Sequence, residues 1–80
     1  MRRQLNMKST FIFIKAAEGG LAKQAQAILN IVEAKEEISK DNLLQQIELD
    51  VKSKQKAQRL LSYYKGQLIT KGFMEERKHG

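Results

Sequence analysis

The sequence predicts a small α+β domain in which three helices pack against a small antiparallel sheet. Three segments repeat their apolar residues at helical spacing, and two short segments of β-forming residues lie toward the ends of the chain. A chain of 80 residues allows one hydrophobic core and therefore one domain. We expect that domain over residues 9–80, after a flexible basic leader at residues 1–8.

The first expected strand is the apolar run from Phe11 to Ile14, whose β-forming residues are too few for a helix. Gly19 and Gly20 then interrupt the chain. Apolar residues three and four positions apart follow, and they predict a first helix from about Leu21 to Glu36. Its expected buried residues are Leu21, Ala25, Ile28, Leu29 and Val32.

Ser39 predicts the start of a second helix, because its side chain can accept a hydrogen bond from an exposed backbone N–H group of the first turn. This helix should span about ten residues, and residues 49–52 should form a tight connection to the next one. Its expected buried residues are Leu43, Leu44 and Ile47. Two roles stay open for Ile38, a hydrophobic contact with this helix or a one-residue bridge to the sheet.

Ser53 can cap a third helix, which should end near Lys71. Its expected buried residues are Ala57, Leu60, Leu61, Tyr64 and Leu68, whereas Tyr63 should be exposed. Gly66 leaves two alternatives: a continuous helix in which the glycine packs against a neighbouring helix, or a helix that ends there and a hairpin over residues 67–77. We expect the continuous helix, because its apolar stripe extends beyond the glycine.

Gly72 can adopt the left-handed conformation that ends a helix, and residues 73–77 then alternate as a half-buried strand. Too few residues follow for a hairpin with a further strand. The expected sheet therefore combines this strand with the N-terminal one, together with Ile38 where it forms a bridge.

The positive charge is concentrated in one segment. The net charge is +6, yet residues 52–71 hold six Lys and Arg residues and no acid, whereas residues 33–51 hold six acidic residues against two basic ones. A cationic stretch without acids is typical of an element that binds a polyanion, and it also occurs on solvated helix faces.

The composition argues against an enzyme and predicts no cofactor. The chain has no cysteine and one histidine, so it lacks a thiolate metal site and a histidine cluster or dyad. A domain of this size cannot easily enclose a substrate. The longest apolar run is too short to span a membrane, so we expect a cytoplasmic protein without a membrane partner.

The order of strand, helix, short helix, tight turn, basic helix, glycine and strand resembles the winged helix-turn-helix family. The resemblance is carried by residues 27–32 in the first helix, residues 38–44 around the start of the second, and residues 68–77 at the end of the third. The last segment reads Leu-Ile-Thr-Lys-Gly-Phe-Met-Glu-Glu-Arg. The resemblance implies a winged helix-turn-helix fold with an abbreviated wing, and a third helix that enters the major groove of DNA.

This resemblance makes the outer face of the third helix the candidate DNA-binding site. Gln55, Gln58 and Arg59 are the candidate base readers, because glutamine can pair with adenine and arginine with guanine. The candidate phosphate contacts are Lys52, Lys56 and Lys65, with Arg2 and Arg3 of the leader following the backbone or a minor groove. The remaining candidate contacts are Lys54, Ser62 and Tyr63. Neutralising about five phosphates would make the logarithm of the binding constant fall with the logarithm of salt concentration at a slope of roughly −4 to −5.

A second similarity is to the N-terminal domain of the middle-promoter transcription activators of T-even bacteriophages. It is carried by residues 13–16, 27–29 and 66–75. It implies a viral regulator that acts on transcription in the host cytoplasm, through contact with RNA polymerase.

Two functions follow from these patterns. The first is a small transcription regulator that reads duplex DNA with its basic third helix, as a homodimer where the operator is palindromic. The alternative is a winged-helix protein-interaction module, such as a viral protein that binds host RNA polymerase or another host assembly. In that case the acidic segment at residues 33–51 is the expected partner surface.

Overall fold

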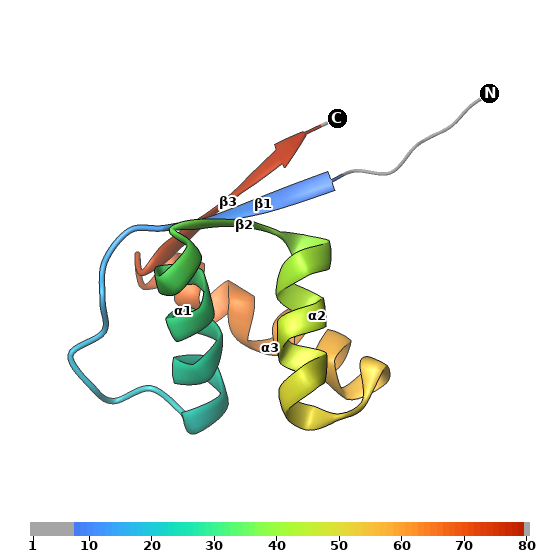
Figure 1. Ribbon diagram of the computed structural model, residues 1–80. Helices are drawn as coiled ribbons and strands as arrows, with labels where there is room; N and C mark the ends of the chain where they lie inside the picture. Colours follow the sequence, from blue (N-terminus) through green and yellow to red (C-terminus); the bar gives the residue numbers. More distant parts are fainter. Residues whose placement is uncertain (1–7, 80) are drawn as a thin grey trace.

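A three-stranded antiparallel sheet lies along one side of the computed structural model, which describes residues 8–79, and the helices lie on the other side (Figure 1). The strands are β1 (Lys8–Phe13), β2 (Glu37–Ser39) and β3 (Met74–His79). The helices are α1 (Lys23–Lys35), α2 (Lys40–Val51) and α3 (Lys54–Thr70). The expected α+β class, with three helices and a small antiparallel sheet, is confirmed for the described residues.

The sheet has the order β2-β1-β3, so the N-terminal strand occupies its centre. Phe11 of β1 lies opposite Ile38 of β2 on one side and Glu76 of β3 on the other. Ile38 therefore belongs to the sheet, in a strand of three residues rather than a single bridge. β1 begins at Lys8, the last residue of the expected leader, and residues 1–7 lie outside the described part of the chain.

The hydrophobic core lies between the helices and one face of the sheet. The core residues expected from helical spacing and found buried are Ala25, Ile28, Leu29, Val32, Leu43, Ile47, Ala57, Leu61 and Leu68. Phe11, Ile38 and Met74 complete the core from the sheet. Leu21, Leu44, Leu60 and Tyr64 were expected to be buried as well, but they are only half-buried and pack against the edge of this core. Leu44, Leu60 and Tyr64 lie at the margins of the apolar stripes of α2 and α3, whereas Leu21 precedes the first residue of α1.

Helix α2 is longer than the sequence predicts, and the expected connection over residues 49–52 is wrong. Residues 49–51 are helical, because none of them interrupts a helix. The connection to α3 consists of Lys52 and Ser53, and Lys52 ends α2 in a left-handed conformation. The second and third helices are thus joined by a two-residue turn.

Helix α3 continues through Gly66, so the hairpin alternative is wrong and the continuous helix is confirmed. The proposed packing role of Gly66 is also wrong, because a Cβ atom built on it would meet no atom within 4 Å. Gly72 has the expected left-handed conformation, with φ at 83°. The Phe73 backbone N–H then donates to the Leu68 carbonyl over 3.0 Å, and the chain turns into the sheet.

Strand β3 begins one residue after the start of the expected strand, which covers residues 73–77, and ends two residues after its end. Its burial alternates as predicted: Met74 is buried, Glu75 is exposed, Glu76 is half-buried and Arg77 is exposed. In the described part of the chain, β3 is the single strand after α3. No hairpin follows α3 among the described residues.

Candidate nucleic-acid interface

Helix α3 presents a buried face and an exposed face along its N-terminal half. Ala57 and Leu61 point into the core. Gln55, Arg59 and Ser62 are exposed, and their spacings of four and three residues place them in one line on the side away from the core. We call these three residues the outer line. Since α3 contains no acidic residue, nothing on the helix itself neutralises the charge of this line.

The N-terminal end of α3 is positively charged. Lys54 and Lys56 lie in its first turn, which holds no acidic residue, and both side chains are exposed. Ser53 caps the helix as predicted, because its hydroxyl oxygen accepts a hydrogen bond from the Lys56 backbone N–H over 3.2 Å. The remaining free N–H groups of the first turn add partial positive charge. This end of α3 therefore favours an anion such as a phosphate group.

Lys52 has a backbone conformation that favours glycine. Its φ is 61° and its ψ is 31°, and its N–H donates to the Glu48 carbonyl over 2.7 Å. Residues with a Cβ are disfavoured in this left-handed conformation. Such a residue commonly ends a helix, and the Lys52 side chain is exposed there, next to the cationic end of α3.

The flank of α3 that faces α2 is less positive than the sequence predicts. Lys54 and Gln58 line a hollow of about 370 Å³ together with Asp41 and Glu48 of α2. The two carboxylates oppose the approach of a phosphate to this hollow. The acidic and basic segments, which follow one another in the sequence, therefore face each other between the two helices.

Lys40 is a candidate contact that sequence reasoning missed. It is the first residue of α2 and lines a hollow of about 210 Å³ with Gln58, Ser62 and Lys65 of α3. The hollow combines two ammonium groups with a hydroxyl and an amide, which are donors suited to a phosphate. No compositional signal marks Lys40, because it lies in the acidic segment.

Lys65 lies beside the same hollow, but its ammonium group is already engaged. Its Nζ atom is 3.6 Å from Oε2 of Glu76 on β3. Both side chains are largely shielded, with 29% and 13% of their surfaces exposed. The carboxylate compensates part of the Lys65 charge, so Lys65 is a weaker candidate for a phosphate contact than the exposed Lys56.

Tyr63 is 65% exposed, as expected, and its ring contacts that of Tyr64. The two rings meet edge to face, with centroids 4.7 Å apart and planes at 84°. Such pairs contribute about 0.5–1.5 kcal/mol beyond the area that they bury. The exposed Tyr63 ring lies beside the outer line as a candidate contact surface for a phosphate, a base or a protein.

Arg2 and Arg3, the candidate contacts of the leader, lie outside the described residues. Over residues 8–79, no cluster of acidic and histidine side chains could hold a metal ion. None of the helices described here is long and apolar enough to cross a membrane.

The fold and the site together define a small α+β protein with an exposed cationic helix. No protein-family model matches the chain, and comparison with the curated proteins and with the solved structures yields no match. A function for the chain is therefore inferred from the geometry of α3 and of the helices around it.

Proposed function

We propose that this chain is a winged helix-turn-helix protein with an abbreviated wing, and that it regulates transcription by binding duplex DNA with α3. The observation that carries the proposal is the outer line of Gln55, Arg59 and Ser62, which is exposed, lies at the cationic end of α3 and has no acidic residue on its own helix. The two-residue turn between α2 and α3 supports the same arrangement.

In this proposal the outer line enters the major groove, which is wide enough for an α-helix. The Arg59 guanidinium donates two parallel hydrogen bonds to a guanine, and the Gln55 amide pairs with an adenine. Gln58 reads bases only from the edge of the contact, because it also lines the hollow with the α2 carboxylates. Arg59 is therefore the main source of sequence preference.

The phosphate contacts flank this line. Lys52 and Lys56 bind the backbone at the N-terminal end of α3, and Lys40 binds it from the start of α2. Arg2 and Arg3 follow the backbone or a minor groove, as the sequence predicts. Asp41 and Glu48 disfavour DNA between α2 and the first turn of α3, which restricts the duplex to the outer side of the helix.

Selection from a pool of random duplexes tests this function. We expect enrichment of a short motif, and Arg59→Ala should weaken binding to it by roughly 5- to 150-fold, or about 1–3 kcal/mol. Lys23→Ala is the matched control, because it removes an exposed cation from α1, away from the proposed contact. Equal losses for the two variants, or a pool without an enriched motif, would contradict sequence reading by α3.

A further inference from the structure

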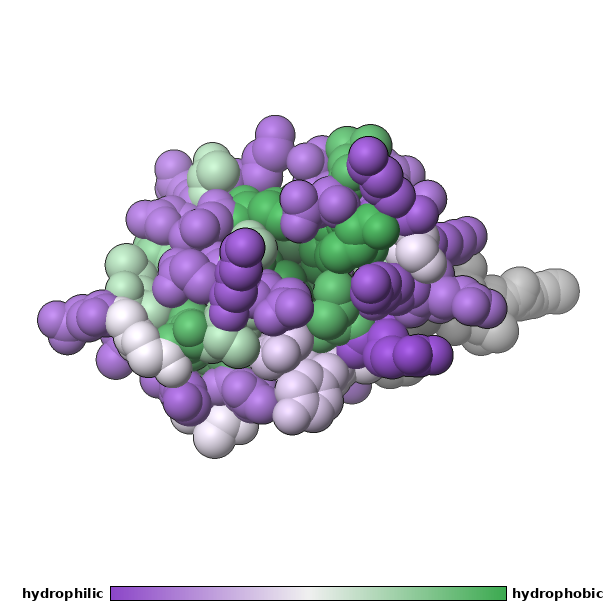
Figure 2. Space-filling model, turned by 90° about the horizontal axis from the view of Figure 1, so that it is seen from below, coloured by the Kyte–Doolittle hydropathy of each residue, from purple (hydrophilic) through white to green (hydrophobic). Residues whose placement is uncertain are grey.

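A groove opens between the three helices on the side away from the sheet. It has a volume of about 350 Å³ and is lined by residues of α1, α2 and α3. Figure 2, which views the molecule from that side, shows apolar surface gathered in a hollow between polar side chains. Its apolar lining includes Ile28, Ile31, Ile47, Val51 and Leu60.

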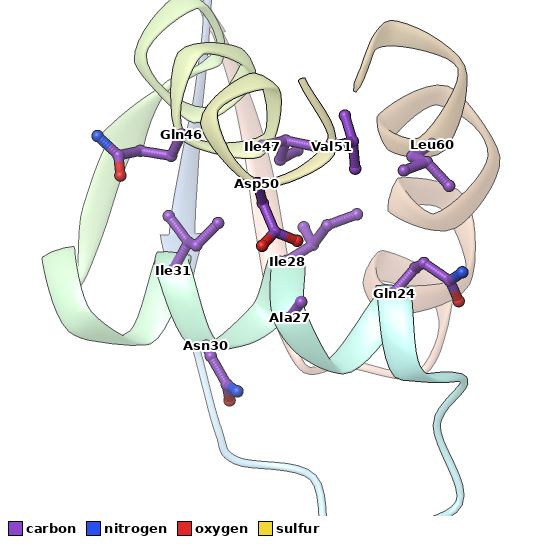
Figure 3. Close-up of a pocket in the computed structure, with 10 residues that line it drawn as sticks. All are labelled: Gln24, Ala27, Ile28, Asn30, Ile31, Gln46, Ile47, Asp50, Val51 and Leu60. Atoms are coloured by element: carbon purple, nitrogen blue, oxygen red, sulfur yellow. The ribbon is translucent and has the colours of Figure 1, made fainter. Parts of the chain in front are cut away.

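The apolar lining of the groove is accessible rather than closed off. Ile31, Val51 and Leu60 are half-buried, although their side chains are large and aliphatic. Figure 3 shows them on three different helices around the same space. A groove walled by helices and lined in this way suits the apolar face of an amphipathic helix, which anchors its side chains three and four residues apart.

The lining of the groove is negatively charged, whereas the net charge of the chain is positive. Its lining contains no Lys or Arg, and its one charged residue is Asp50, in a protein with a net charge of +6. Figure 3 shows the Asp50 carboxylate pointing from α2 toward α1. Asp50 also lies in the last turn of α2, which has no basic residue and carries the negative end of the helix dipole. This local field attracts a cation and repels a nucleic acid.

We propose that this groove binds an amphipathic helix of a protein partner, which inserts apolar side chains between α1 and α2 and places a Lys or Arg beside Asp50. The proposal does not depend on DNA binding. Leu60 and Arg59 are adjacent on α3 and therefore point about 100° apart around its axis. The groove and the outer line therefore lie on different sides of α3.

Two designed helical peptides test the proposal. Both carry leucine at positions i, i+3, i+4 and i+7, and their polar positions are lysine in one and glutamate in the other. Amide chemical shifts of the isotope-labelled protein report where each peptide binds. The net charge of the protein favours the glutamate peptide, so tighter binding of the lysine peptide identifies a local effect.

We expect the lysine peptide to shift amides of α1 and of the C-terminal half of α2, and to bind there more tightly than the glutamate peptide. Asp50→Asn should weaken it by about twofold to fivefold, and Asp50→Lys should reverse the preference. Ile31→Gln should weaken both peptides while the protein keeps its circular dichroism spectrum. Asp41→Asn is the matched control, because Asp41 is an exposed acid of α2 outside the groove, and it should change neither affinity.

Several outcomes would overturn the proposal. The glutamate peptide could bind the groove as tightly as the lysine peptide, or the shifts could fall on α3 alone. Asp50→Lys could leave the preference unchanged. Groove amides that shift with protein concentration in the absence of peptide would identify a second copy of the chain as the occupant. In none of these cases does the result bear on duplex binding, which is measured with separate variants.

Discussion

The Lys65 Nζ atom lies 3.6 Å from Oε2 of Glu76, and this salt bridge joins the C-terminal half of α3 to β3. It ties the proposed recognition helix directly to the sheet. The Glu76 carboxylate also compensates one of the six cations in residues 52–71. Glu76 itself lies outside that segment, so the charge count of the segment does not include it. The uncompensated positive charge on α3 is therefore smaller than the sequence alone indicates.

Breaking this salt bridge from its acidic side should strengthen DNA binding. Glu76→Gln leaves the Lys65 ammonium group uncompensated next to the hollow that also contains Lys40, so we expect duplex affinity to rise by about twofold to fivefold. The unfolding free energy should fall by no more than about 1 kcal/mol, since both groups are partly exposed.

Glu75→Gln is the control for this experiment. It changes the net charge by the same amount, but Glu75 is exposed and its side chain lies on the opposite face of the sheet. Its effect on affinity should be clearly smaller. Equal gains for the two variants would mean that affinity depends on net charge alone.

Replacing Gly66 should stabilise the protein. Gly66 lies inside α3, and an added Cβ would meet no atom within 4 Å, so Gly66→Ala should raise the unfolding free energy by about 0.5–1 kcal/mol in urea denaturation. Gly72→Ala should have the opposite effect, because its φ of 83° is unfavourable for alanine. A loss of stability in Gly66→Ala would show that α3 is not continuous at this point.

Substitutions of Ser53, the cap of α3, should change the unfolding free energy and the duplex affinity independently. Ser53→Ala removes the acceptor for the Lys56 N–H and should lower the unfolding free energy by about 1 kcal/mol, whereas Ser53→Asn should preserve it. Ser53→Asp should also preserve stability, yet its carboxylate lies at the end of α3 where a phosphate is proposed to bind. Duplex affinity measured by fluorescence anisotropy should therefore fall in Ser53→Asp alone. Unchanged affinity in this variant would place the DNA elsewhere.

The conformation of Lys52 makes a further prediction. Lys52→Gly relieves a disfavoured backbone conformation and should raise the unfolding free energy by up to about 1 kcal/mol, while duplex affinity decreases because a phosphate contact is lost. Glu36→Gly is the matched control, since Glu36 also has a positive φ, of 63°, but lies after α1. It should gain stability without losing affinity. An affinity loss shared by both variants would contradict a specific role for Lys52.

Features that depend on neighbours along the chain could be predicted from the sequence. Helical spacing identified the residues that α1, α2 and α3 bury most deeply. Ser39 and Ser53 both cap helices as expected, because a cap is a hydrogen bond between residues three apart. Gly72 ends α3 for an equally local reason, its freedom to adopt a positive φ. The end of α2 was missed because a lysine occupies the left-handed position that usually belongs to glycine.

Features that depend on the angles between helices could not be predicted in this way. Three such features bring together residues from separate elements. They are the contact of Lys65 with Glu76, the hollow that Lys40 lines with Ser62 and Gln58, and the groove that contains Asp50. The periodicity of apolar residues says which face of a helix is buried, but it does not fix the crossing of one helix over another. For this reason the sequence did not identify Lys40 as a candidate contact, and it did not show that Lys65 is a weaker candidate.

The salt dependence of duplex binding tests the central claim most directly. Lys40, Lys52, Lys56, Arg2 and Arg3 are proposed to neutralise about five phosphates, which gives a slope of roughly −4 to −5 when the logarithm of the binding constant is plotted against the logarithm of salt concentration. The measurement is a fluorescence anisotropy titration of the selected duplex at increasing salt. A slope in that range supports duplex binding through about five phosphate contacts. A slope flatter than about −2, or no binding at the lowest salt concentration, would contradict it.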